Sequence, residues 1–346
     1  MTIRKYILLF MILLSSCKKT EIGKCDDLQS LYSFSDFPIG FAIDMNELNN
    51  DSHYYEIAVS QFNSVTPGNI FKPYYLHPAE SYFDWFEADR LVEFCQNNNK
   101  RLHGHTLIWH NQLPDWIMNF QGSQSEWELM FKEHIQTICL HFKGKVKSWD
   151  VVNEAINDNG TLRNTIWKQK IGNSYIEKAF RYAHEADPDA FLFYNDYDIA
   201  LNETKRKAIL SLLNNLRQRG VTVHGIGMQM HISVVHPENH QIAAALKELS
   251  ENDFKIHLSE VDISLNPLSR EFELTEELLE RQANKLAAIT LLYKEIPSRY
   301  QYGITFWGVS DRNSWIREHF NRDDYPLLFD DNYNPKPVYC KFKETL

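Results

Sequence analysis

Two glutamates, Glu154 and Glu260, are the side chains of this chain best suited to do chemistry. Glu154 directly follows the predicted strand 146–153, and Glu260 lies near the end of the predicted strand 255–262. Two carboxylates that face one another can divide catalysis, with one transferring protons and the other attacking as a nucleophile. Taken singly, Glu154 could be the acid at a helix N-terminus and Glu260 the acid of a salt bridge. The elements around them decide between these interpretations.

Eight apolar segments alternate with helical patterns between residues 37 and 346. The predicted strands are 37–44, 61–66, 101–107, 146–153, 190–196, 225–230, 255–262 and 302–307. Apolar residues at helical spacing lie between them, as at Phe131, Ile135, Ile138 and Phe142. The alternation predicts one α/β domain, a single (β/α)8 TIM barrel. An open doubly wound sheet is the alternative, but its usual glycine-rich phosphate turn is missing after the first strand.

Polar and indole side chains gather where these strands end. They are Asn69, Lys72, His105, Trp109, Gln112, Asn153, Glu154, Gln229, His231, Glu260, Asp262, Trp307 and Trp315, and His110, Tyr194, Asn195 and Asp196 lie at strand ends as well. In a barrel the carboxyl ends of all strands meet at one mouth, so residues distant in sequence become neighbours. The sequence therefore predicts a catalytic site at that mouth.

The facing pair Glu154 and Glu260 would suit hydrolysis of a glycosidic bond. The acid/base of such a pair must hold a proton, and burial or a nearby negative charge favours the protonated form. Glu154 has apolar neighbours and would face an ionised Glu260, so it fits that role. Asn153 could hydrogen-bond a sugar 2-hydroxyl. His231 could orient Glu260 and keep it ionised, although a buried structural histidine would show the same pattern.

Several motifs resemble those of glycoside hydrolase family 10, the endo-β-1,4-xylanases, which are retaining (β/α)8 barrels. They are GHTLIWH at 104–110, WDVVNEA at 149–155, YNDY at 194–197, GIGMQMH at 225–231, SEVDI at 259–263, FWGVSD at 306–311, PLLFD at 326–330 and YNPKP at 333–337. The likeness runs in order over residues 36–343. It implies retaining hydrolysis of internal bonds in xylan and xylo-oligosaccharides by a monomer that needs no metal or organic cofactor.

The resemblance also implies roles by position. Glu154 matches the acid/base of the family and Glu260 its nucleophile, while Asn153 matches the residue that holds the sugar 2-hydroxyl. His231 and Asp262 match the groups that support the nucleophile. The positions that match residues of the glycone subsites are Asn69, Lys72, His105, Trp109, Gln112, Gln229, Trp307 and Trp315.

One loop departs from the family pattern, which usually reads Thr-Pro-Glu-Asn with Lys-Trp soon after. This chain has TPGN at 66–69 and Pro73 after Lys72. Gly68 replaces a glutamate that grips the sugar two places from the cleaved bond, and such a charged hydrogen bond is worth ~1.5–3 kcal/mol. We expect a weaker or wider distal glycone subsite, unless another residue of the loops compensates. The candidates are Tyr74, Tyr75 and Glu47.

The balance of charged residues indicates which classes of binding partner are unfavoured. The net charge is −10, from 36 basic and 46 acidic residues, and no long basic run is present. Nucleic acid and anionic lipid are therefore unfavoured as main partners. The 8 Trp and 17 Tyr exceed what a core requires and suit stacking on sugar rings.

Residues 1–17 are predicted to be a lipoprotein-type signal peptide. Arg4 and Lys5 precede an apolar run at 6–14, which is shorter than the ~20 residues of a membrane span. LSSC at 14–17 resembles a bacterial lipoprotein cleavage site, which implies a lipidated Cys17 and a tether over residues 18–36. An ordinary signal peptide with an incidental cysteine is the alternative. We expect an exported protein anchored by lipid in the bacterial cell envelope, in the periplasm or on the outer-membrane surface.

The other cysteines divide into two groups. Cys95 and Cys139 fall on apolar stripes of predicted helices and are expected to be core thiols. Cys25 and Cys340 lie near the two ends of the chain, and an oxidising compartment would permit a disulfide between them. No cysteine or histidine spacing suggests a zinc site.

Two other functions stay open. One is a related retaining glycosidase that acts on another β-glycan. The other is a surface xylan-binding lipoprotein with weak catalysis, which the substitution at Gly68 motivates. The presence of both carboxylates and their supports favours an enzyme.

Overall fold

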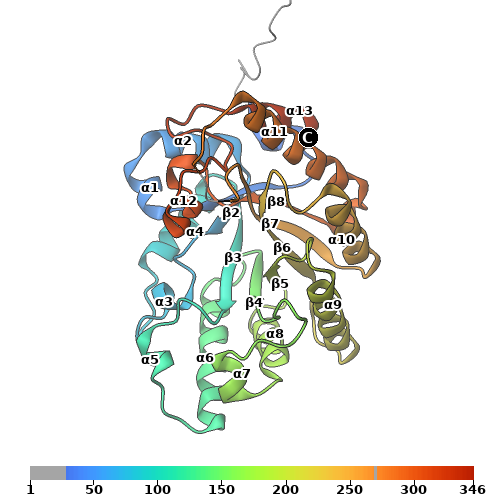
Figure 1. Cartoon of the computed structure of the whole chain (residues 1–346). Helices are drawn as coiled ribbons and strands as arrows, with labels where there is room; N and C mark the ends of the chain where they lie inside the picture. The colour runs from blue at the N-terminus through green and yellow to red at the C-terminus, as the bar shows by residue number, and fades with distance from the viewer. Residues whose placement is uncertain (1–28, 269–270) are drawn as a thin grey trace, which may run out of the picture.

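Eight parallel strands form a closed barrel in a computed structural model that describes residues 29–268 and 271–346. Each strand pairs with the next in chain order, and β8 closes the barrel on β1. The strands are β1 (Ile39–Ile43), β2 (Ser64–Pro67), β3 (Arg101–Ile108), β4 (Ser148–Asn153), β5 (Phe191–Tyr197), β6 (Gly225–Ser233), β7 (Lys255–Ser264) and β8 (Gln301–Phe306). The predicted single (β/α)8 TIM barrel is confirmed (Figure 1).

Helices fill the connections and cover the outside of the barrel (Figure 1). They are α1 (Met45–Asn50) and α2 (Ser52–Gln61) after β1; α3 (Pro73–Leu76) and α4 (Phe86–Asn97) after β2; α5 (Asp115–Met118) and α6 (Gln124–His141) after β3; α7 (Ile166–Ile171) and α8 (Tyr175–Ala186) after β4; then α9 (Glu203–Gln218), α10 (Asn239–Glu251) and α11 (Glu276–Glu295); and, after β8, α12 (Trp315–Phe320) and α13 (Pro337–Thr345). Short 3-10 turns occur at Leu31–Phe34, Ser298–Tyr300 and Asp311–Asn313.

Helix α6 illustrates why these segments fold as they do. Ser123 caps its first turn in a capping box with Glu126, so that side chains satisfy backbone N–H groups that have no partner inside the helix. Phe131, Ile135 and Ile138 then form a stripe that is fully buried. Burying such a side chain contributes about 1.5–3 kcal/mol, so the stripe holds the helix on the barrel.

The ends of the barrel domain bear on the predictions about cysteines and the tether. Cys95 and Cys139 are buried free thiols, as expected. Cys340 is disulfide-bonded, but Cys25 lies outside the described residues, so their pairing stays a prediction. The predicted signal peptide and Cys17 lie outside the described residues as well. Within the segment expected to be a tether, Leu31 is buried in the hydrophobic core.

None of the helices in the described part of the chain is long and apolar enough to cross a membrane.

Candidate active site

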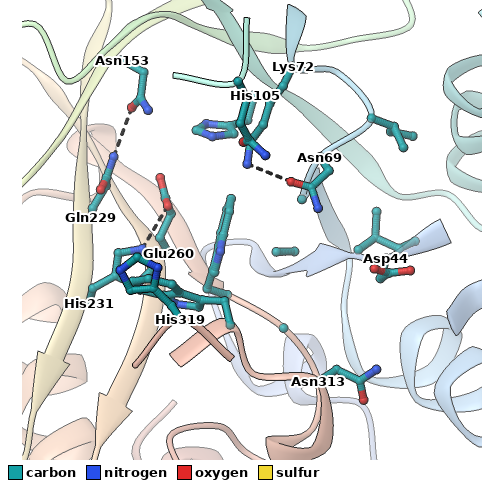
Figure 2. Close-up of a pocket in the computed structure, with 18 of the residues that line it drawn as sticks. Asp44, Asn69, Lys72, His105, Asn153, Gln229, His231, Glu260, Asn313 and His319 are labelled. Carbon is teal, nitrogen blue, oxygen red and sulfur yellow. Dashed lines mark hydrogen bonds and ion pairs between the residues drawn. The ribbon is translucent and has the colours of Figure 1, made fainter. Parts of the chain in front are cut away.

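A cavity of about 940 Å³ opens at the carboxyl ends of the strands. Twelve of the thirteen predicted site residues line it, and the thirteenth, Asp262, lies behind His231. The twelve are Asn69, Lys72, His105, Trp109, Gln112, Asn153, Glu154, Gln229, His231, Glu260, Trp307 and Trp315. Figure 2 shows Asn153 paired with Gln229, His231 paired with Glu260, and Lys72 paired with Asn69 around this cavity.

Both glutamates have an unusual backbone conformation. Glu154 and Glu260 each have φ +56°, in the left-handed region that residues other than glycine rarely adopt. The pairing register also shifts nearby, between Asp150 and Val152 on β4 and between Leu258 and Val261 on β7. Such irregularities change the direction of side chains and are concentrated at functional sites. Here they direct both carboxylates toward the mouth of the barrel, at a cost in backbone conformational energy.

Glu154 is half-buried and is hydrogen-bonded at both carboxylate oxygens. Trp109 Nε1 donates to Oε2 at 2.9 Å. The side-chain amides of Asn153 and Gln229 each donate to Oε1 at 3.3 Å. These donors come from three different parts of the barrel, so the position of the carboxylate depends on the closed fold.

Glu260 is only 6% exposed and has a different set of partners. Asn195 Nδ2 donates to its Oε1 at 2.7 Å, and His231 Nε2 lies 3.1 Å from its Oε2. The other ring nitrogen of His231 lies 2.8 Å from Asp262 Oδ2, which also accepts a hydrogen bond from Trp315 Nε1 at 2.8 Å. A carboxylate, an imidazole and a second carboxylate thus form one line behind the cavity.

The electrostatics of this line make Glu260 an anion. Burial opposes charge on His231, but Asp262 and Glu260 outweigh it and raise the pKa of His231 to about 10. Burial likewise opposes charge on Glu260, yet the hydrogen bond and positive charge of His231 lower the pKa of Glu260. At neutral pH the site therefore holds an imidazolium against a buried carboxylate.

Asn195 lies at a predicted strand end, but we assigned it no role in the site from the sequence. Its Nδ2 donates to Asn153 Oδ1 at 2.9 Å as well as to Glu260, and its Oδ1 accepts from Ser259 Oγ at 2.7 Å. A Cβ at Gly227 would lie 2.1 Å from Asn195 Oδ1, so only glycine leaves room for this amide. The available signal was its place in the YNDY motif at the end of β5.

Lys72 and His105 face the glutamates. Lys72 Nζ donates to Asn69 Oδ1 at 3.0 Å and lies 5.2 Å from the centre of the Trp109 ring. Burial lowers the pKa of Lys72 to about 8, although Glu260 and Glu154 act in the opposite direction. His105 Nδ1 lies 2.9 Å from the buried Asp150, which fixes the orientation of the ring in the cavity.

Gly68 and Pro73, the two residues that depart from the family pattern, have different surroundings. Gly68 lines the cavity, and a Cβ built there would have one neighbour within 4 Å, Ile43 O at 3.3 Å. Pro73 is instead buried as the first residue of α3, where its fixed φ suits a helix start. Of the residues expected to compensate, Tyr75 lines the cavity, whereas Tyr74 and Glu47 are not among the lining residues.

The cavity also has lining residues to which we assigned no role from the sequence. They are Asp44, Asn46, Tyr197, Asp198, Asn313 and His319, among others. Across residues 29–268 and 271–346, no cluster of three or more His, Cys, Asp or Glu side chains is arranged to hold a metal ion.

A closed parallel barrel with two carboxylates, amides and indoles in its mouth is the arrangement of a (β/α)8 glycoside hydrolase. Comparison with known proteins agrees: the model of glycosyl hydrolase family 10 matches residues 28–345. The chain belongs to this family, as its motifs indicated.

Three relatives illustrate the similarity. Endo-1,4-beta-xylanase B of Thermotoga neapolitana is 37% identical over 341 residues, which cover 97% of this chain and 96% of that protein. Exoglucanase XynX of Acetivibrio thermocellus is 38% identical over 325 residues, covering 90% of this chain and 29% of that protein. The crystal structure of xylanase 10B from Thermotoga petrophila in complex with xylobiose has a TM-score of 0.86 at 37% identity, covering 93% of this chain and 98% of that one.

The raised pKa of His231 predicts a pH dependence of stability. Its pKa is about 10 in the folded protein against 6.5 as the ordinary value, so folding favours its protonated form. The stabilisation is fully present below pH 6.5 and is lost as pH rises through about 10. We expect the difference in Tm between wild type and His231→Gln to shrink from pH 6 to pH 10.5, as measured by thermal denaturation.

The matched control is His240→Gln, because the side chain of His240 is 75% exposed. Its difference in Tm from wild type should stay small at every pH. A His231→Gln difference that is constant across the range would contradict the assignment of an imidazolium.

Proposed function

We propose that the protein is an endo-β-1,4-xylanase that cleaves internal bonds of xylan and xylo-oligosaccharides with retention. The observation that carries this proposal is a chain of hydrogen bonds between the two glutamates. From Glu154 Oε1 it passes through Gln229 Nε2, Asn153 Oδ1 and Asn195 Nδ2 to Glu260 Oε1, with steps of 3.3, 3.1, 2.9 and 2.7 Å. The names of the relatives support the substrate class.

In the first step Glu260 attacks the anomeric carbon as a nucleophile. Its charge is maintained by His231, so it needs no base to activate it. Glu154 donates its proton to the glycosidic oxygen as the carbon–oxygen bond breaks. The aglycone part of the chain leaves, and the glycone part stays bound to Glu260 as an ester.

In the second step Glu154 changes from a general acid to a general base. As a carboxylate it accepts a proton from water, which attacks the anomeric carbon and releases Glu260. Two inversions give net retention. Asn153 lies between the two glutamates in the hydrogen-bond chain, where its amide can hold the sugar 2-hydroxyl, a contact that strengthens in the transition state.

The rest of the cavity supports the binding of a sugar chain. The indoles of Trp109, Trp307 and Trp315 offer flat apolar faces for xylose rings, while Asn69, Lys72, His105, Gln112 and Gln229 offer hydrogen bonds to hydroxyls. The missing side chain at Gly68, which lines the cavity, supports a weaker or wider distal glycone subsite. Because one relative is named an exoglucanase, activity on cellulose and mixed-linkage glucan should be compared with activity on xylan.

We further propose that the enzyme acts as a monomer outside the cytoplasm, anchored by a lipid on Cys17. The support is the sequence of residues 1–17, with its basic start, short apolar run and LSSC ending. A lipid anchor would hold the barrel near the cell surface without a membrane span.

One prediction of the proposed function concerns the two carboxylates. Glu154→Gln should lower kcat/KM on xylan by ~10²–10⁴-fold because general acid–base catalysis is lost, and Glu260→Gln should lower it at least as much because the nucleophile is lost. Reducing-sugar release measures both. Proton NMR of the wild-type reaction should show the β-anomer as the first product.

The control for these variants is Glu251→Gln, since the side chain of Glu251 is 63% exposed on α10. It should retain wild-type activity. If the wild type released no more sugar than Glu154→Gln and Glu260→Gln, the protein would be a binding protein with weak catalysis instead. An α-anomer as first product would rule out double displacement.

The second prediction concerns Gly68. Gly68→Glu should raise kcat/KM on nitrophenyl β-xylobioside about 10-fold by adding a charged hydrogen bond to the distal sugar. It should change nitrophenyl β-xyloside little, because that substrate does not reach the distal subsite. Gly68→Ala is the matched control, as it adds the Cβ without the carboxylate. A Gly68→Glu variant that gains on no substrate, including longer xylo-oligosaccharides, would refute the idea.

The third prediction concerns the anchor. In a Gram-negative host the wild type should sediment with membranes, and mass spectrometry should find a lipid on its N-terminal cysteine. Cys17→Ala should move the protein to the soluble fraction. Equal partitioning of the two proteins would favour an ordinary signal peptide.

A further inference from the structure

The buried hydroxyl of Tyr194 contacts the backbone directly after Glu154. It accepts hydrogen bonds from the N–H groups of Ala155 at 2.9 Å and Ile156 at 3.1 Å. It donates its own proton to Asp196 Oδ2 at 2.5 Å. A phenol has one donor and two acceptor positions, so this hydroxyl is fully used. Nothing in the proposed mechanism uses Tyr194, although it belongs to the YNDY motif.

A buried ion pair fixes the orientation of this hydroxyl. Asp196 Oδ1 lies 2.9 Å from Lys205 Nζ, and both side chains are fully buried. Burial raises the pKa of Asp196 to about 6 against the effect of Lys205, with the negative charge of Glu154 contributing to the rise. Because Asp196 carries no proton of its own while paired with Lys205, it accepts from Tyr194. The phenol oxygen therefore presents its lone pairs to the two backbone N–H groups.

The segment that Tyr194 holds is the one under conformational strain. Glu154 has φ +56°, its N–H donates to Asn195 O at 2.9 Å, and its carbonyl accepts from Arg163 Nε at 3.0 Å. The Arg163 N–H also donates to Ala155 O at 2.8 Å, so with the two bonds to Tyr194 the backbone of residues 154–156 is held by five hydrogen bonds. A left-handed conformation of a non-glycine residue persists only where its surroundings over-determine it.

We propose that Tyr194, oriented by Asp196 and Lys205, is a positioning residue that holds the backbone of Glu154 so that its carboxyl points at the leaving-group oxygen. The inference rests on the proposed role of Glu154 as acid/base. A small displacement of a catalytic group has a large effect on rate, because proton transfer requires hydrogen-bond distance to the reacting oxygen. A residue that merely stabilises the barrel would affect all substrates alike.

The leaving group of the substrate separates these two roles. Departure of a sugar hydroxyl needs a proton from Glu154, whereas dinitrophenolate leaves without one. The ratio kcat/KM reports the steps up to formation of the glycosyl-enzyme, so it measures acid assistance to departure. Misplacement of Glu154 therefore slows cleavage of xylo-oligosaccharides and spares that of dinitrophenyl β-xylobioside.

The test is Tyr194→Phe, which removes the hydroxyl and keeps the ring. We expect kcat/KM on xylotetraose to fall about 10–100-fold, a part of the ~10²–10⁴-fold that general acid catalysis provides. On dinitrophenyl β-xylobioside we expect a change below about 3-fold. Lys205→Met should produce the same selective loss by releasing Asp196. Equal losses on both substrates, or no loss on either, would overturn the proposal.

Tyr293→Phe is the matched control for loss of a buried hydroxyl. Tyr293 OH donates to Ile256 O at 2.6 Å and accepts from the Gly303 N–H at 2.9 Å, near the amino ends of β7 and β8. This variant should lower Tm without changing the ratio of the two kcat/KM values. Titration with a 2-fluoro xylobioside that traps the nucleophile counts the folded sites in each preparation, so partial unfolding does not mimic the effect.

Glu154→Gln is measured beside these variants as the reference. If it too shows no selective loss on xylotetraose, the acid/base assignment itself is wrong. If it shows the selective loss and Tyr194→Phe does not, the positioning role of Tyr194 alone is refuted.

Discussion

A carboxylate removed from water stays ionised only where nearby charge and donors replace its hydration. Glu260 is almost fully buried, and the groups that replace water around its carboxylate are Asn195 on one oxygen and His231 on the other. His231 can supply a full positive charge only because Asp262 stands on its far side. The arrangement of the site follows from this requirement, since removing any member leaves a buried charge without its partner.

The barrel meets the requirement by taking these groups from neighbouring strands, with Glu260 and Asp262 both on β7. Asn153, Asn195, His231 and Glu260 come from β4, β5, β6 and β7, which are neighbours in the closed sheet. Parallel strands end at the same edge, so their last residues face one cavity. Register shifts in β4, β6 and β7 lie close to the functional residues, so the sheet departs from regular pairing where it forms the site.

Much of this could be predicted from the sequence because the barrel has a repeating pattern. Each strand is a short apolar run that ends in polar residues, and a site at the mouth follows from the topology alone. Local pattern placed Asn195 at a strand end but could not predict its contacts, because they depend on space that Gly227 leaves on the next strand. Nor could it separate Gly68 from Pro73, since one residue lines the cavity and the other starts a helix. Such distinctions depend on which atoms lie across a gap, and that information is tertiary.

The contrast between the surroundings of Glu154 and those of Gly68 suggests how the enzyme combines fixed chemistry with adjustable recognition. The backbone N–H and C=O groups of Glu154 and Ala155 are all hydrogen-bonded, and the phenol of Tyr194 has no unused position. Gly68 lines the cavity without a side chain, so it offers no side-chain hydrogen bond to a sugar. Proton transfer tolerates little displacement, whereas binding of a distal sugar tolerates the loss of one hydrogen bond at a modest cost in affinity. The departure from the family pattern at Gly68 thus falls where we propose that a distal sugar binds, so it lowers affinity there without displacing the reacting groups.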